Sequence, residues 1–134
     1  MSNTSPASLG LNKWHALVAA RDATRLDALL ARDVVFHSPV VHTPQVGKDI
    51  TIKYLSAAVQ VLMDESFHYV REVVQGDQTA LEFVAERNGI QINGIDLITW
   101  NPAALITDFK VMVRPLKAIN ALHQLMGAEL AKGS

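Results

Sequence analysis

Residues 79–114 read TALEFVAERNGIQINGIDLITWNPAALITDFKVMVR, and this stretch decides the fold. It holds three runs rich in β-branched and aromatic residues, which predict strands over Thr79–Arg87, Gln91–Trp100 and Leu105–Arg114. An Asn-Gly pair and an Asn-Pro pair separate the runs, and both pairs favour tight turns. Because links this short cannot cross a sheet, we expect the three strands to be antiparallel neighbours.

A fourth strand is predicted directly upstream, over Phe67–Gln75, with Gly76-Asp77 as the turn that follows it. The last of the four strands alternates clearly. One face is mostly apolar and carries Leu105, Thr107, Phe109, Val111 and Val113. The other face is mostly polar and carries Asp108, Lys110, Met112 and Arg114. One face of this sheet should therefore be buried.

Helical patterns come before the four strands and after them. Apolar residues recur at helical spacing from Leu11 to about Asp22, and again along Lys48–Met63. Between these two helices, Thr24 and Asp27 resemble a capping box that would start a second, short helix. The run Val34–His37 then predicts a short strand, and residues 38–47 predict a loop. A terminal helix should begin at Pro115, a favoured residue in the first turn.

This order of elements indicates an α+β fold in one domain, with helices grouped before an antiparallel meander and one helix after it. The chain has 134 residues, which suits one domain and is too short for two ordinary ones. We expect residues 1–10 to form a disordered tail and residues 11–130 to form the domain.

The composition excludes several classes of protein. The formal net charge is -1, so the chain lacks the excess of basic residues that nucleic-acid binding proteins carry. No cysteine is present, which excludes disulfides and thiolate chemistry. No signal peptide is recognisable, and no apolar run approaches the roughly 20 residues of a membrane span. We therefore expect a cytoplasmic protein with no nucleic-acid or membrane partner.

Three stretches resemble the nuclear transport factor 2-like superfamily, to which the SnoaL-like proteins belong. The first is Trp14–Asp22 leading into Leu29–Phe36, the second is the glycine turn Val46–Ile50, and the third is Gly94–Trp100 followed by Ile106–Val111. The resemblance covers most of the chain. It implies a cone-shaped, curved antiparallel sheet wrapped around three N-terminal helices, plus a C-terminal helix, with a pocket inside. The family includes ketosteroid isomerase, dehydratases, cyclases and non-catalytic binding proteins, so the resemblance leaves the chemistry open.

Asp96 is the first candidate for chemistry. It shares the parity of its strand with Ile92, Ile98 and Trp100, which would place a carboxyl group among apolar neighbours and raise its pKa. By resemblance to ketosteroid isomerase, Asp96 matches the strand aspartate that helps to hold a developing oxyanion. The alternative is that Asp96 faces solvent, since Ile95 and Leu97 make the opposite face apolar too.

Two other positions depart from the isomerase pattern. Ser38 stands where the family has a carboxylate base, and Trp14 stands where it has a tyrosine. Steroid isomerisation by the known mechanism is therefore not expected. His37, beside Ser38, is the obvious substitute for the base, because imidazole titrates near neutral pH. The competing interpretation of His37 is a structural or exposed histidine.

The remaining candidates would line the pocket. These are Trp14, Tyr54, His68, Phe83 and Trp100, for which core packing is the competing interpretation. His37, His42 and His68 could converge on a metal ion, but their spacing matches no metal motif, so no metal site and no cofactor are predicted.

Two hypotheses about function remain. In the first, the chain is a cofactor-free acid–base enzyme acting on a small apolar molecule, with Asp96 and His37 as the catalytic pair. In the second, it is a non-catalytic binding or scaffold protein whose pocket is filled by side chains or holds a metabolite. Both hypotheses include a homodimer, formed through the sheet face that carries Met112.

Overall fold

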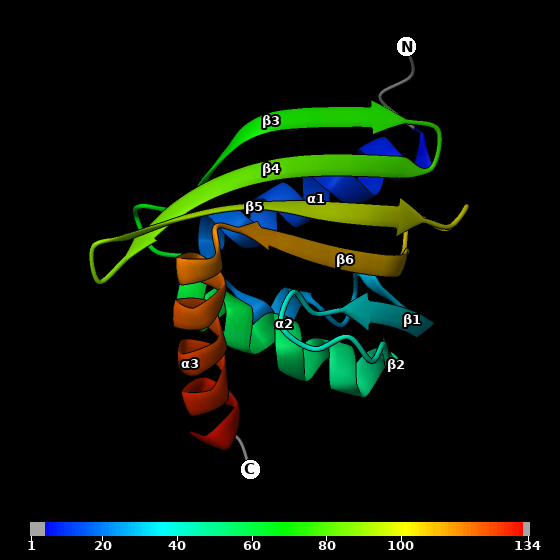
Figure 1. Cartoon of the computed structure of the whole chain (residues 1–134). Helices are drawn as coiled ribbons and strands as arrows, with labels where there is room; N and C mark the ends of the chain where they lie inside the picture. The colour runs from blue at the N-terminus through cyan, green and yellow to red at the C-terminus, as the bar shows by residue number, and fades with distance from the viewer. Residues whose placement is uncertain (1–4, 133–134) are drawn as a thin grey trace.

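In this computed structural model, which describes residues 5–132, a bent six-stranded sheet is packed against three α-helices (Figure 1). The helices are α1 (Pro6–Ala20), α2 (Lys48–Leu62) and α3 (Leu116–Lys132), and a single 3-10 turn, η1 (Ala23–Arg25), follows α1. The strands are β1 (Leu30–His37), β2 (Gln45–Val46), β3 (His68–Gln75), β4 (Gln78–Arg87), β5 (Ile90–Trp100) and β6 (Ile106–Arg114). The predicted α+β fold is confirmed.

The sheet is mixed, with the strand order β2-β1-β6-β5-β4-β3. Strands β3 to β6 form the antiparallel meander that the turn residues predict. Strand β1, however, lies parallel to β6, with Phe36 opposite Phe109. The prediction of a purely antiparallel sheet is wrong at this one junction. Segments so far apart in sequence have no short turn between them, so nothing local indicates their relative direction.

Helix α1 begins earlier than expected. Its first residue is Pro6, preceded by Ser5 as N-cap, whose Oγ accepts a hydrogen bond from the Ser8 amide at 3.1 Å. This is a favoured way to start a helix, because the serine oxygen satisfies a free amide and proline needs none. The expected disordered tail over residues 1–10 is therefore wrong from Pro6 onward, and residues 1–4 lie outside the described part of the chain.

The predicted second helix is only the turn η1. Asp22, rather than Thr24, is the capping residue, and its carboxylate accepts the Thr24 amide at 3.1 Å. The chain then enters β1 at Leu30, where it already pairs with Ile106, four residues before the strand predicted from Val34. The predicted loop over residues 38–47 is confirmed except for the two-residue strand β2.

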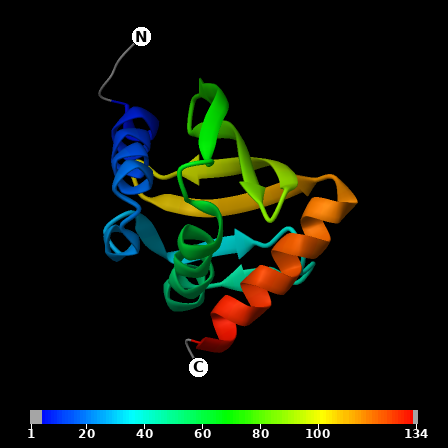
Figure 2. The ribbon, with the colours of Figure 1, turned by 90° about the vertical axis from the view of Figure 1, so that its left-hand side faces the viewer.

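The helices cover one face of the bent sheet and leave the other exposed. Figure 1 shows α1 behind β4 and β5, α2 beside β1, and α3 descending from the end of β6, where it packs on β5 and β6; Figure 2 gives the same elements turned by 90°. Helix α2 packs on both β1 and α3. Within residues 5–132, no helix is both long and apolar enough to cross a membrane.

Candidate functional site: a buried carboxyl in an apolar cavity

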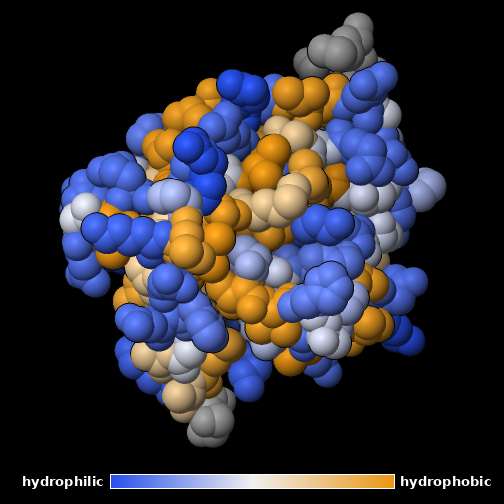
Figure 3. Space-filling view, viewed as in Figure 1, coloured by the Kyte–Doolittle hydropathy of each residue, from blue (hydrophilic) through white to orange (hydrophobic). Residues whose placement is uncertain are grey.

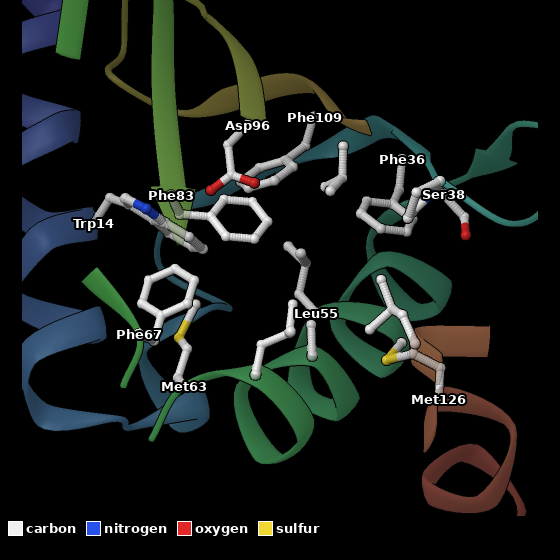
Figure 4. A pocket seen from close by; sticks show the side chains of 15 residues that line it. Trp14, Phe36, Ser38, Leu55, Met63, Phe67, Phe83, Asp96, Phe109 and Met126 are labelled. Carbon is white, nitrogen blue, oxygen red and sulfur yellow. The ribbon is translucent and has the colours of Figure 1, made fainter. Parts of the chain in front are cut away.

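A small cavity lies between the sheet and the helices, and Asp96 is the ionisable group in its described lining. Most of the lining is aromatic or aliphatic and comes from every layer of the fold: Trp14 from α1, Leu55 from α2, Phe83 from β4, Phe109 from β6 and Met126 from α3. Figure 4 shows Asp96 descending from β5 between these rings, with Ser38 and Met126 on the far side of the cavity.

Asp96 is in the interior because of the alternation along β5. Every second residue from Ile92 to Trp100 is buried, and Asp96 falls in that series with only 5% of its surface exposed. The prediction that Asp96 shares the buried parity is confirmed, and the solvent-facing alternative is wrong. A charged group in such surroundings loses most of its hydration.

The environment of the carboxyl changes its acidity. Burial raises the pKa of Asp96 to about 7, because the ionised form is poorly solvated. A hydrogen bond from the Tyr69 hydroxyl, 2.7 Å from Asp96 Oδ2, acts in the opposite direction and favours the ionised form. Near neutral pH the carboxyl therefore exists in both forms, which suits a group that gives and takes a proton.

Aromatic rings make most of the surroundings of Asp96 apolar. The rings of Phe67 and Phe83 stack with their centroids 5.1 Å apart, and the ring centroids of Trp14 and Phe109 are 5.2 Å apart. Gly94 makes room for one of them, since a Cβ at this position would lie 2.2 Å from Cζ of Phe83. The absence of a side chain two residues before Asp96 thus lets the Phe83 ring fold across β5 and close the cavity.

The cavity is small. Its volume is about 50 Å³, whereas sites for drug-sized ligands measure about 300–1,000 Å³. At roughly 10–15 Å³ for each enclosed water, it has room for a few waters or a ligand fragment of similar size. Met63 and Met126 are part of the lining, and methionine side chains adjust their shape more easily than most. A larger ligand would need these two side chains to move.

His37 does not lie at the cavity. Its side chain is on the opposite face of β1 from the buried Phe36, and its Nε2 lies 2.9 Å from Asp108 Oδ1. Together with His42 and Lys110, it lines a separate hollow on the surface. The structure therefore does not bring His37 and Asp96 together.

The five predicted pocket residues divide into two groups. Trp14 and Phe83 line the cavity. Trp100 is buried elsewhere, where its indole N–H donates to Thr79 Oγ1 at 2.9 Å. Tyr54 packs beside Phe36, with the two ring centroids 5.6 Å apart. His68 is exposed at the start of β3. In the described part of the chain, no three histidine or acidic side chains gather closely enough to hold a metal ion.

Tyr69 is the partner of Asp96 that the sequence analysis did not identify. It stands opposite Phe83 in the β3–β4 pairing, and its hydroxyl reaches Asp96 across β4. Alternation alone would have grouped Tyr69 with Arg71, which is exposed. A bulge between these two residues puts them on opposite faces of the sheet. A polar aromatic residue near the start of a strand was the only available signal.

Comparisons with known proteins agree with this fold. Residues 11–109 match the model of the SnoaL-like domain family. A steroid delta-isomerase from Pseudomonas aeruginosa is 37% identical, with a TM-score of 0.90 over 95% of this chain and 93% of that one. An uncharacterized protein with a cystatin-like fold from Silicibacter pomeroyi is 36% identical, with a TM-score of 0.82 over 89% of this chain and 83% of that one.

A more distant structure shows the fold alone. A putative ketosteroid isomerase from Kribbella flavida is 15% identical, with a TM-score of 0.66 over 86% of this chain and 82% of that one. The search of curated proteins found no match. The family model covers most of the chain, and the two structures named first are 37% and 36% identical to it over the aligned residues. The chain therefore belongs to the SnoaL-like domain family and has the nuclear transport factor 2-like fold.

Proposed function

We propose that this protein binds a small, mostly apolar molecule and moves a proton on it through Asp96, without a cofactor. The observation that carries the proposal is the position of Asp96, a carboxyl with a pKa of about 7 at the wall of an otherwise apolar cavity. A general acid–base group is most effective when its pKa lies near the working pH. The similarity to a protein described as a steroid delta-isomerase supports a ketone as the substrate class.

A single carboxyl is sufficient for one such reaction, the movement of a double bond toward a carbonyl group. Ionised Asp96 removes the proton from the carbon between the carbonyl and the double bond, and the C–H electron pair forms the dienolate. Neutral Asp96 then returns the proton to the far end of the dienolate, which gives the conjugated ketone and restores the carboxylate. No oxidant, metal or second base is consumed.

The experiment uses β,γ-unsaturated ketones of increasing size, from 3-cyclohexenone to a 5-ene-3-ketosteroid, and follows the ultraviolet absorbance of the conjugated product. We expect turnover of the smallest ketones, because the cavity is only about 50 Å³. Asp96→Asn should lower the rate by about 10²–10⁴-fold, the usual contribution of a general acid–base group. Asp108→Asn is the matched control, since Asp108 pairs with His37 outside the cavity.

An undiminished rate in Asp96→Asn would contradict the proposal. A second candidate, favoured by the small cavity volume and by serine at the family's base position, is a binding protein without turnover. In that case the wild-type protein would bind the small ketones, seen as shifts of amide resonances from residues around the cavity, and would convert none of them.

We also propose that the chain forms a homodimer through the exposed face of its sheet. Apolar residues from four adjacent strands follow one another across this face: Val73, Ala80, Ile95, Leu97 and Met112. Figure 3 looks onto it and shows apolar surface over the middle strands, with hydrophilic residues around it. A second copy of the same face would cover this apolar band.

A further inference from the structure

Asp96 is the end of a chain of hydrogen bonds that crosses three elements. The indole Nε1 of Trp14, on α1, donates to the Tyr69 hydroxyl on β3 at 3.0 Å. The same hydroxyl donates to Asp96 Oδ2 on β5 at 2.7 Å. Trp14 is 1% exposed, so its N–H is shielded from bulk solvent. The family resemblance would place a substrate-binding tyrosine at position 14, but here the polar atom of Trp14 is occupied by Tyr69.

The donor and the acceptor of each hydrogen bond in this series follow from elementary chemistry. An indole N–H can only donate a hydrogen bond, so the Tyr69 oxygen must be the acceptor in the first bond. The hydroxyl has one proton, and that proton is left for the second bond, to Asp96 Oδ2. Burial, followed by the nearby carboxylate, raises the pKa of Tyr69 well above its usual value of 10.0, so the hydroxyl keeps its proton at working pH. Oδ2 is consequently an acceptor in both protonation states of Asp96.

The other carboxyl oxygen is left for the cavity. Oδ1 of Asp96 has no hydrogen-bond donor among the residues that the structure describes. Within the same residues, no fully buried side-chain oxygen or nitrogen lacks a partner, so Oδ1 is not sealed in protein and reaches open space. Because Asp96 lines the cavity, the cavity is the open space that Oδ1 reaches.

We propose that Trp14 and Tyr69 are positioning residues: they hold Asp96 Oδ2 as a fixed acceptor and so reserve Oδ1 as the atom that exchanges a proton with the ligand. The inference rests on the proposed function and assigns its chemistry to one atom. In the ionised state Oδ1 is the free base, and in the neutral state it carries the proton that faces the ligand. Neither Trp14 nor Tyr69 needs to touch the substrate.

One pair of ionisable side chains lies close enough to Tyr69 to matter for a pH experiment. The imidazole of His15, on α1, packs edge-on against the Tyr69 ring at 5.8 Å, and its Nε2 lies 2.7 Å from Glu72 Oε1 on β3. Because this pair contacts the Tyr69 ring, a pH-dependent signal that starts at the pair must be separated from one that starts at Asp96. Asp96→Asn removes the second signal and leaves the first intact.

The test follows the indole N–H resonances of the protein by ¹H–¹⁵N NMR from about pH 3 to about pH 9, a range that includes both the ordinary aspartate pKa of 3.8 and the Asp96 pKa of about 7. We expect the Trp14 resonance to move with a midpoint near the Asp96 pKa of about 7, because two hydrogen bonds connect them. The Trp100 resonance is the internal control, since its N–H donates to Thr79. Asp96→Asn should abolish the movement at Trp14.

Two substitutions complete the test. Tyr69→Phe removes the one donor to the Asp96 carboxyl found within residues 5–132 and should raise the carboxyl pKa above its wild-type value, as read from the Asp96 side-chain ¹³C resonance. Trp14→Phe should raise it by a smaller amount. A Trp14 resonance that stays constant while Asp96 titrates near 7 would overturn the inference and leave the proposed function standing. An Asp96 titration near 4 would instead overturn the proposed function.

Discussion

At the scale of single residues, Asp96 makes the protein less stable as the pH rises. The folded state holds the Asp96 proton up to a pKa of about 7, and the unfolded state releases it near 3.8. Between these values the folded state binds more protons, so the free energy of unfolding falls as the pH increases. The difference in pKa corresponds to about 4 kcal/mol in the free energy of unfolding. This stability is lost between about pH 4 and about pH 7 and is not regained at higher pH.

Asp96→Asn should therefore stabilise the protein at high pH. Asparagine keeps an oxygen that can accept from Tyr69, and it carries no charge to bury. In urea unfolding at about pH 4.5 and about pH 8, we expect the variant to gain a few kcal/mol over the wild type at the higher pH only. Asp33→Asn is the control, because Asp33 is exposed. An equal effect of Asp96→Asn at both pH values would show that the carboxyl is not buried in its charged form.

The sequence indicates Asp96 but does not indicate what surrounds it. Asp96 could be placed in the interior because the alternation along Gln91–Trp100 is regular. Its partner could not be found, because β3 contains a bulge between Tyr69 and Arg71. One extra residue in a strand reverses the face of every residue beyond it, and no residue type in HYVREVVQ marks the position.

At the scale of elements, the contact between α1 and β5 depends on Gly10. A Cβ at Gly10 would lie 2.2 Å from Cζ3 of Trp100. That ring is 2% exposed and is held by its bond to Thr79, so it cannot easily move aside. In an open helix, replacing glycine by alanine stabilises by about 0.4–1 kcal/mol. Here the clash should outweigh that gain, and Gly10→Ala should destabilise by about 1–3 kcal/mol.

Gly127 provides the matched control in the same fold. It lies on α3, exposed, and an added Cβ would meet nothing within 4 Å. Gly127→Ala should therefore raise the melting temperature, while Gly10→Ala should lower it, as measured by circular dichroism. A higher melting temperature for both variants would mean that α1 does not pack as closely on Trp100 as the structure shows.

Local signals also explain which elements could be predicted. The four strands of the meander and the helix Lys48–Leu62 follow from alternation, helical periodicity and turn residues, and their bounds agree with the prediction to within one or two residues. The parallel pairing of β1 with β6 and the two-residue strand β2 depend on contacts between distant segments. The capping role of Asp22 was missed because Thr24 offers an equally good capping residue two positions later.

At the scale of the whole molecule, the exposed sheet face should decide the oligomeric state. Met112 is 49% exposed on that face. If two copies pair there, Met112→Glu buries two like charges in the interface and should turn the dimer into a monomer, as measured by light scattering at micromolar concentration. Val46→Glu is the control, because Val46 is 70% exposed on β2, at the far edge of the sheet. A wild-type mass equal to one chain would contradict the proposed dimer.

The most direct test of the central claim is the side-chain ¹³C titration of Asp96 in the wild-type protein. Asp96 is the one feature on which the cavity, the hydrogen-bond chain and the proposed reaction all depend. The structure predicts a midpoint near 7, caused by burial among aromatic rings. A midpoint near the ordinary aspartate value of 3.8 would contradict it, because the carboxyl would then be fully ionised and solvated at neutral pH.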